Sequence, residues 1–311
     1  MARYIVRRLL HSVLVVAGVT MLVYFILFQT GDPTFLSVSP DATVEEVAHV
    51  RHQLGYDRPW YVQYEDYLSG LVHGDLGTSL RQQRPVYDMI RERMPATIEL
   101  TVAAMAIALI VALPVGIISA ARRNSIWDNL SMLGAMTGQS VPVFFLGIML
   151  LYVFGGELGW FPIGGRGQGN IGDELRHLIL PAVTLSAASM ARNARLVRSN
   201  LLEVLGQDYV RTARAKGLGE TGVVLGHALR NSLIPVVTLI GLEFGALLGG
   251  AVVTETVFAW PGMGSMVIKA IGQRDFPVVV GAVTTLSLLF VIINLLVDLS
   301  YVWLDPRIRY G

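Results

Sequence analysis

Residues 203–237 read EVLGQDYVRTARAKGLGETGVVLGHALRNSLIPVV, a polar and Arg-rich stretch between two of the most apolar parts of the chain. The pattern predicts a short basic helix over Asp208–Lys216, a break at the Gly-Leu-Gly of 217–219 and a second helix over Glu220–Asn231. Arg residues that only fix membrane topology would explain the charge, but they would not explain two ordered helices around a glycine turn. We therefore interpret this stretch as a docking element.

The composition of the whole chain indicates a membrane protein. Hydrophobic residues make up 53% and charged residues 15%, with a mean hydropathy of +0.55, which is more apolar surface than a soluble chain of this length can bury. Cysteine is absent, which excludes disulfides, thiolate metal sites and a Cys nucleophile. The net charge of +1 argues against a nucleic-acid partner.

Six apolar runs are candidates for transmembrane helices, each of which needs about 20 apolar residues. Five of these runs are long enough to cross a membrane: Leu9–Phe28, Ile98–Ala121, Leu130–Phe154, Leu233–Val253 and Val278–Leu304. The sixth begins at Leu178 but meets Arg192 too soon to cross the hydrocarbon core alone. We expect its inner end to reach the interface through the long side chains of Arg192, Arg195 and Arg198. The sequence thus predicts an all-α integral membrane protein with six transmembrane helices.

The connectors between these runs orient the chain. The N-terminus and the segments 121–129, 192–232 and 305–311 are rich in Lys and Arg and poor in acids, whereas the alternate connectors are acidic. The positive-inside rule then predicts that both termini and the docking element are cytoplasmic. The first run is longer than the apolar part of a signal peptide, and no small-residue cleavage pattern follows it, so we expect a retained helix.

The same orientation divides the chain into regions. Residues 1–28 form the cytoplasmic N-terminus and first helix, and 29–97 form an external cap with helical patches at Thr43–Leu54 and Trp60–Leu71. Residues 98–311 form the core, with the cytoplasmic docking segment at 203–232 and an outer segment at 254–277. The glycine-rich GGRGQG at 164–169 follows no predicted strand, so we interpret it as a turn and not as a phosphate loop.

Enzyme motifs are missing from the chain. It contains no G-x-x-x-x-G-K-[ST], no H-E-x-x-H and no G-x-S-x-G, so we predict no catalytic residue, no metal site and no ATPase within it. Glu243 lies inside an apolar run, where an ionisable group either lines a polar pathway or pairs with neighbouring helices. Pro142 removes a backbone hydrogen bond inside its run and produces either a gating kink or a packing kink.

The docking element also carries a family resemblance. Residues 208–237 resemble the cytoplasmic coupling loop, known as the EAA loop, of permease subunits of ATP-binding-cassette importers of the dipeptide, oligopeptide and nickel group. The resemblance extends along the chain through ARYIVRRLL at 2–10, GDP at 31–33, QLGYDRPWYVQY at 53–64, GDLGTS at 74–79, RMPATIELT at 93–101, SVPVFFLG at 140–147, ETVFAWPGMG at 255–264, RDFPVV at 274–279 and DPRIRYG at 305–311.

This resemblance implies a type I importer permease fold and assigns a role to the docking element. Arg211, Thr212 and Ala213 stand at the Glu-Ala-Ala positions of the family, and Arg230 replaces a proline common in relatives. That replacement is typical of the peptide group and argues against sugar transport. The implied ATPase-coupling residues are Asp208, Tyr209, Arg211, Thr212, Ala213, Arg214, Ala215, Lys216, Gly217 and Leu218. We expect the cations Arg211, Arg214 and Lys216 to meet an acidic cleft on the ATPase.

The resemblance also implies partners and a location. The long first outer loop is similar to that of the B-type permease, which pairs with a second, C-type permease. Two ATPase subunits or domains would hold ATP and Mg, and an extracytoplasmic substrate-binding protein would deliver substrate. The chain itself would need no cofactor, would contact membrane lipid and would lie in a bacterial or archaeal plasma (inner) membrane.

The outer segment completes the set of candidate pathway residues. Its apolar content predicts a re-entrant element beside the outer mouth of the pathway, with Phe258 and Trp260 packed inside and a turn at Pro261-Gly262. The alternative is an amphipathic helix lying flat at the interface. We expect the charged groups of this segment to stay near the interface, where the binding protein docks. These groups are Lys269, Arg274 and Asp275, and the full set of pathway or gate candidates is Ser140, Pro142, Glu243, Phe258, Trp260, Pro261 and Gly262.

Substrate is the least determined property. Di- or oligopeptides lead, with glutathione and chelated nickel as alternatives, although the six His are not clustered, which argues against a nickel site in the chain. A proton-coupled secondary transporter that uses Glu243 is the less favoured alternative.

Overall fold

The computed structural model describes residues 2–36, 38–39 and 41–304. In this part of the chain the secondary structure is helical, apart from an isolated bridge between Thr78 and Pro85. The chain divides into two compact units: unit 1 comprises Met1–Ala96 and Pro261–Gly311, and unit 2 comprises Thr97–Trp260. Helix α4 (Val86–Ala121) belongs to both. The last stretch of the family resemblance, at 305–311, lies outside the described residues.

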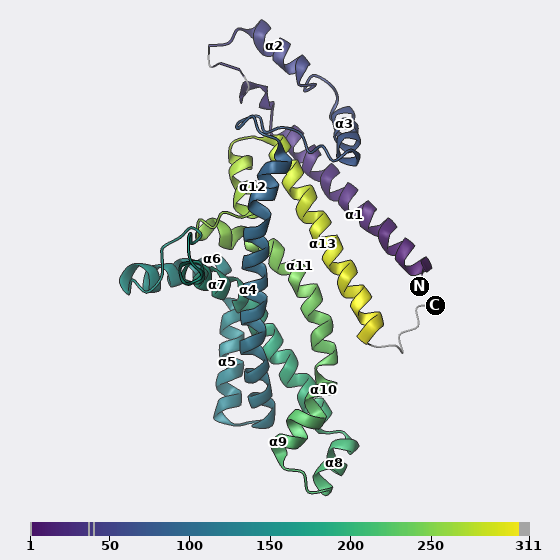
Figure 1. Cartoon of the computed structure of the whole chain (residues 1–311), viewed down its shortest axis with the longest axis vertical. Helices are drawn as coiled ribbons and strands as arrows, with labels where there is room; N and C mark the ends of the chain where they lie inside the picture. The colour runs from purple at the N-terminus through teal and green to yellow at the C-terminus, as the bar shows by residue number, and fades with distance from the viewer. Residues whose placement is uncertain (1, 37, 40, 305–311) are drawn as a thin grey trace. The chain divides into compact units, whose positions relative to one another are not determined.

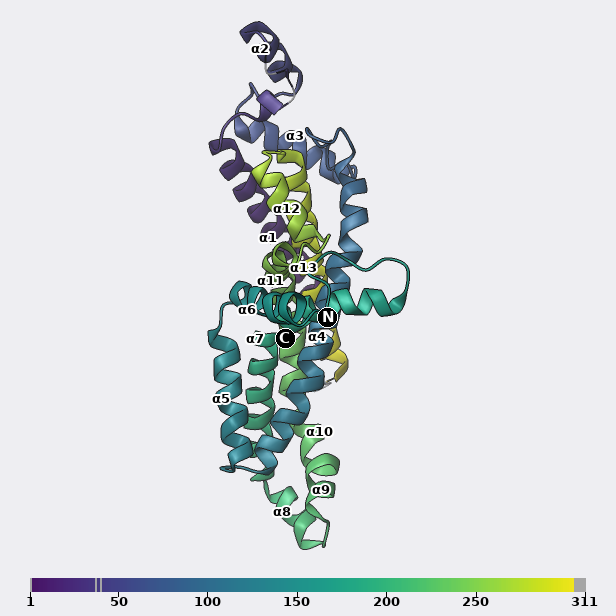
Figure 2. The ribbon, with the colours of Figure 1, turned by 90° about the vertical axis from the view of Figure 1, so that its left-hand side faces the viewer.

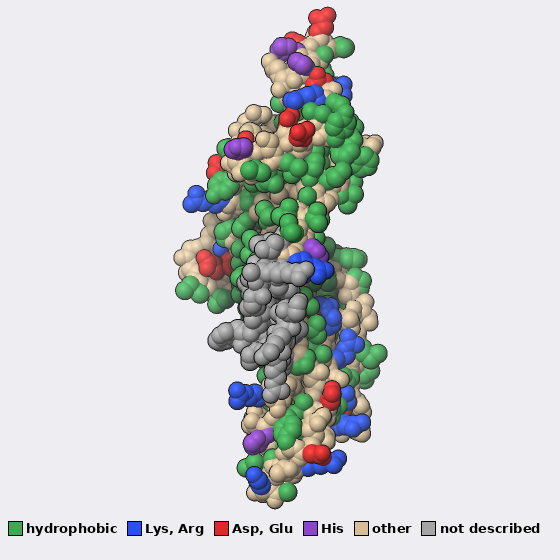
Figure 3. Space-filling view, turned by 90° about the vertical axis from the view of Figure 1, so that its right-hand side faces the viewer, with side chains coloured by type: hydrophobic (Ala, Val, Ile, Leu, Met, Phe, Trp, Pro, Cys, Tyr) green, Lys and Arg blue, Asp and Glu red, His purple; other side chains and the backbone are tan. Residues whose placement is uncertain are grey.

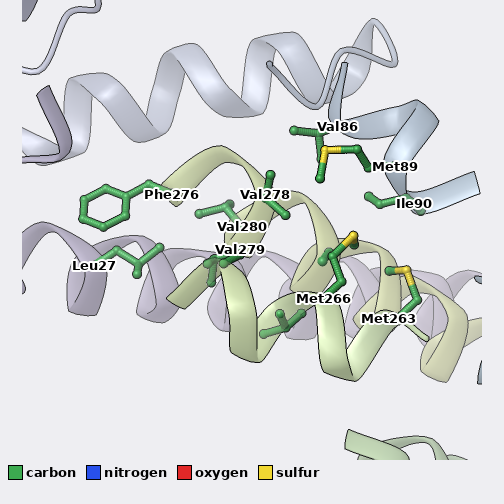
Figure 4. Close-up of a cluster of buried hydrophobic side chains, with 13 residues drawn as sticks. Leu27, Val86, Met89, Ile90, Met263, Met266, Phe276, Val278, Val279 and Val280 are labelled. Carbon is green, nitrogen blue, oxygen red and sulfur yellow. The ribbon is translucent and has the colours of Figure 1, made fainter. Parts of the chain in front are cut away.

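Unit 1 is built on two long helices, α1 (Ala2–Gln29) and α13 (Phe276–Leu304), which pack on each other. The short helix α12 (Met263–Gly272) packs on α13, and the first turns of α4 complete the core. Figure 4 shows side chains from all four helices converging, among them Leu27, Met89, Met266 and Val279. Burial of these apolar groups is what holds the four segments together.

The segment that the sequence predicts to be a cap contains helices. Its helices are α2 (Val44–Gln53) and α3 (Trp60–Val72), preceded by the short helix η1 (Pro33–Leu36). Thr43 and Glu46 form a capping box that starts α2. Two tyrosines of α3 anchor the cap: Tyr64 donates to the Ala17 carbonyl at 2.8 Å, and the Tyr67 hydroxyl lies 2.6 Å from that of Thr284.

Of the three charged residues expected near the interface in the outer segment, Asp275 is buried. Lys269 and Arg274 are exposed, but Asp275 is 2% exposed. Its carboxylate accepts hydrogen bonds from the Ser79 hydroxyl and from the Leu80 amide, the latter at 3.0 Å. Asp275 is therefore satisfied inside unit 1 by three polar groups of the 79–81 turn, including the Arg81 amide, and its position near the membrane interface stays a prediction.

Unit 2 is organised around α7 (Ile171–Leu205), against which α5 (Ile126–Ser140), α6 (Val143–Leu150) and α11 (Ile234–Val257) pack. Figures 1 and 2 both show α5, α7 and the second half of α4 running alongside one another. The sequence underestimated α7: it has 35 residues and starts seven residues before Leu178, where Asn170 caps it by accepting from the Asp173 amide.

Among the residues that the structure describes, three helices are long and apolar enough to cross a membrane: Leu10–Gln29 of α1, Val86–Ala121 of α4 and Phe276–Val297 of α13. A fourth follows if α5 and the pair α6–η2 (η2, Leu151–Glu157) count as one span, although they meet at 103°. The predicted span Leu130–Phe154 is broken at its proline, because Val141 is extended and Pro142 caps a new helix. The count of six and the cytoplasmic termini stay predictions.

Candidate functional site

The docking element folds as a small helical unit at one end of unit 2 (Figures 1 and 2). Its helices are α8 (Asp208–Ala215), α9 (Glu220–Gly222), the π-helical turn η3 (Val223–Ala228) and α10 (Leu229–Ser232). Val210 and Ala213 of α8 are buried against Val223 and the last turn of α7. Because α8 has its own apolar contacts, it is held as a rigid body and not as a loose connector.

Gly217 makes the turn between the two helices. Its φ of +83° is a left-handed conformation that L side chains avoid, and its amide donates to the Arg214 carbonyl at 2.9 Å. Arg214 then reaches across the turn and donates to both carboxylate oxygens of Glu220, at 2.8 and 3.3 Å. This guanidinium holds the pKa of Glu220 below its usual value. A third link runs from Asn231 to the Tyr209 hydroxyl at 2.9 Å.

The predicted coupling residues therefore divide into two sets. Val210, which sequence reasoning left out, and Ala213 face inward, and Arg214 is engaged with Glu220 within the chain. The exposed remainder is Asp208, Tyr209, Arg211, Thr212, Ala215, Lys216, Gly217 and Leu218. Arg211 lies 3.4 Å from Asp208, with 72% of its side chain exposed. Lys and Arg side chains are prominent at this end of unit 2 (Figure 3). Arg214 is engaged with Glu220, so Arg211 and Lys216 are the other exposed cations of the predicted set, and their contact with an acidic cleft stays a prediction.

A buried ion pair supports the base of this end of unit 2. Arg198 of α7 donates through Nε and Nη2 to the two carboxylate oxygens of Asp128, at 2.6 and 2.8 Å. Asp128 also accepts from the Ser119 hydroxyl of α4 and from the Asn124 amide, and it is 2% exposed. One carboxylate therefore joins α4, α5 and α7. The expectation that Arg198 reaches the membrane interface stays a prediction, and in the structure its guanidinium pairs with Asp128.

Glu243 is paired as well. Its carboxylate accepts from Nε of Arg192 at 2.8 Å and from Nδ2 of Asn193 at 2.6 Å. The guanidinium of Arg192 thus turns to α11, and the expectation that this side chain reaches the membrane interface stays a prediction. Ser140, another predicted pathway residue, is the last residue of α5. Its hydroxyl donates to the Met136 carbonyl, next to the helix break at Pro142.

The turn that follows α11, at residues 258–260, is tightly packed within unit 2. Phe258 and Trp260 are 1% and 0% exposed. A Cβ on Gly147 of α6 would lie 3.1 Å from the Phe258 ring, and one on Gly164 would lie 2.8 Å from the Phe258 carbonyl oxygen. The Gly165 amide donates to that oxygen at 2.9 Å. Sequence reasoning treated the 164–169 glycines as a plain turn, but they permit this close contact. In unit 1, Pro261 and Gly262 precede α12, and Gly262 caps it.

Arg166 anchors the glycine turn, donating to Glu99 of α4 at 2.6 Å. The turn is therefore tied to α4 on one side and to the Phe258 backbone on the other. The re-entrant placement of residues 254–277 stays a prediction.

Gly164→Ala should loosen this outer turn. The added methyl group meets a backbone oxygen that cannot rotate away, so the Phe258 turn must shift. We expect a buried reporter one turn away, Thr254→Cys in the Cys-free chain, to react several-fold faster with a membrane-impermeant thiol reagent. Gly156→Ala is the matched control, since its Cβ has 3.9 Å to the nearest atom. Equal labelling in both backgrounds would contradict the bracing role.

The chain's relatives identify its family. Residues 112–310 match the family described as "Binding-protein-dependent transport system inner membrane component", and residues 1–101 match its N-terminal component. The chain belongs to this family. It is therefore a multi-pass inner-membrane permease of an ATP-binding-cassette transport system. The expected family resemblance is confirmed.

Two curated relatives match this permease over its whole length. The glutathione transport system permease protein GsiC of Escherichia coli (strain K12) is 45% identical over 311 residues, covering 100% of both chains. The dipeptide transport system permease protein DppB of Alkalihalophilus pseudofirmus is 42% identical over 333 residues, again covering 100% of both chains.

A solved structure confirms the fold. An inward-facing form of the MetNI methionine ABC transporter matches with a TM-score of 0.56 and 19% identity, covering 68% of this permease and 94% of that chain. The all-α type I importer fold predicted from the sequence is thus confirmed.

Proposed function

We propose that this permease forms half of the translocation pathway of an ATP-driven importer for small peptides, and that α8 transmits the ATPase movement to it. The observation that carries the proposal is the docking element itself. It exposes a Tyr-Arg-Thr-Lys surface on a helix whose other face is fixed to α7 by buried apolar contacts. A force applied to such a helix moves the helix below it, whereas a flexible loop would absorb the displacement.

Peptide is the favoured substrate class. Among the relatives, GsiC is named for glutathione, which is a tripeptide, and DppB for dipeptides. Neither relative's name supports nickel as the substrate. A proton-coupled mechanism through Glu243 is also less favoured, because both of its carboxylate oxygens already accept hydrogen bonds, one from Arg192 and one from Asn193.

The partners follow from the family's dependence on a binding protein. We propose a second, C-type permease, two ATPase subunits or domains that hold ATP and Mg, and an extracytoplasmic binding protein. This chain supplies no catalytic residue. Closure of the ATPases favours an outward-facing arrangement of the two permeases and hydrolysis restores the inward-facing one, each state being stabilised by contacts that the other lacks.

Charge reversal tests the docking surface. Arg211→Glu with Lys216→Glu should weaken association with the ATPase about tenfold, equivalent to about 1.4 kcal/mol, and the loss should shrink at high salt. The readout is the amount of ATPase that co-purifies with the permease across a series of ionic strengths. Arg81→Glu with Lys269→Glu, exposed cations of unit 1, is the matched control. Co-purification that is equal for both variants at every ionic strength would count against the proposed surface.

A further inference from the structure

Two helices of unit 2 bring four polar side chains together in apolar surroundings. Glu243 of α11 accepts from Arg192 and Asn193 of α7, and Arg192 donates through Nη2 to the Ser189 hydroxyl at 3.0 Å. Ser189 and Asn193 are 0% and 1% exposed, so both are buried supports. Each fixes one member of the ion pair: Ser189 the guanidinium and Asn193 the carboxylate.

The ion pair is buried unevenly. The Glu243 side chain is 13% exposed, but that of Arg192 is 40% exposed. Within the described residues, Nη1 of Arg192 makes no hydrogen bond, so one edge of a permanently charged group is left open.

The position of the Arg192–Glu243 ion pair along α11 indicates what faces this open edge. Glu243 is the tenth residue of the 24 in α11, about 14 Å from its start at 1.5 Å per residue. This position falls within the transmembrane run Leu233–Val253 that the sequence predicts. A guanidinium at such a depth faces protein or a water-filled cavity, because contact with lipid is costly. The exposed edge of Arg192 therefore belongs to a protein interior or an aqueous path.

We propose that Arg192 and Glu243 form a transit site for zwitterionic peptides, in which Arg192 binds the peptide carboxylate and Glu243 its ammonium group. This inference rests on the proposed function as a peptide permease. Between transport cycles the two side chains neutralise each other. A passing peptide exchanges this one ion pair for two others, so the binding is weak, and weak binding lets the peptide leave again. Asn193 and Ser189 are positioning residues.

Single and double neutral variants separate this role from a structural one. In the complete reconstituted complex, Arg192→Gln and Glu243→Gln should each lower the maximal uptake rate of Ala-Ala or glutathione, whichever the wild type transports, at least tenfold. The half-saturating concentration should not change, since the binding protein sets it. ATPase stimulation by the loaded binding protein should persist in both variants.

The double variant Arg192→Gln/Glu243→Gln decides between the two roles, because it leaves no unpaired charge. A transit site predicts that its uptake stays low. Recovery to half of wild-type uptake or more would overturn the proposal and leave a structural ion pair. Arg195→Gln, whose partner is Gln139, is the matched control on the same helix and should transport normally. Failure of the proposed function has a different signature: the wild type itself would show neither ATPase stimulation nor peptide uptake.

Discussion

Gly217→Pro should abolish coupling between ATP hydrolysis and uptake while leaving the permease in the membrane. Proline fixes φ near −65°, whereas Gly217 has a φ of +83° and uses its amide to close the end of α8. The substitution therefore moves Glu220 away from Arg214 and turns the second helix. We expect uptake to fall at least about tenfold, a loss equivalent to about 1.4 kcal/mol. The measurement is uptake per hydrolysed ATP in the reconstituted complex.

Two matched variants control for general damage to the segment. Gly217→Asn should be milder than proline, because Asn tolerates the left-handed conformation, and no atom lies within 4 Å of a Cβ at this position. Gly219→Ser should be neutral, since Gly219 has a φ of −67° and occupies an N-cap position that Ser favours. Normal coupling in Gly217→Pro would show that the turn geometry is irrelevant to transmission.

Asp128→Ala should destabilise unit 2 more than any exposed charge substitution. The change leaves Arg198 without its counter-ion, in a position where 24% of its side chain is exposed, and removes acceptors for Ser119 and Asn124. Breaking a buried pair on one side costs about 3–5 kcal/mol. The expected result is a large drop in the thermal unfolding temperature of the purified complex and in its membrane level.

Two control variants test whether the loss comes from an unpaired buried charge. Asp128→Leu with Arg198→Leu should recover much of the stability, because no uncompensated charge remains. Glu92→Ala breaks the exposed pair that Glu92 forms with Arg84, and it should cost far less stability, because exposed ion pairs contribute little. A loss for Asp128→Ala no larger than that for Glu92→Ala would contradict the structural role of the buried pair.

Local signals predicted the elements that depend on neighbouring residues. Gly217 between two polar helical patterns predicted the helix pair, and the helical pattern of Thr43–Leu54 predicted α2. The burial of Phe258 and Trp260 also agrees with the apolar pattern of the outer segment. In each of these cases the deciding residues lie within a few positions of one another.

Contacts between distant residues could not be predicted in the same way. Asp128 and Arg198 are 70 residues apart, and Arg192 and Glu243 are 51 apart, so only packed helices bring them together. The break at Val141-Pro142 was also ambiguous, because a proline in an apolar run suits a gentle kink as well as the 103° bend that the structure has. The close contact between Gly164 and Phe258 could not be predicted either, since the two residues are far apart along the chain.

Reconstitution tests most directly whether this permease couples ATP hydrolysis to peptide import. Proteoliposomes would contain the permease, its C-type partner and both ATPase subunits, with peptide-loaded binding protein on the outer side and ATP inside. The account predicts uptake of Ala-Ala or glutathione that requires ATP, Mg and binding protein, persists with an uncoupler and fails with Gly217→Pro. Uptake driven by a proton gradient without ATP, and equal in wild type and Gly217→Pro, would contradict it.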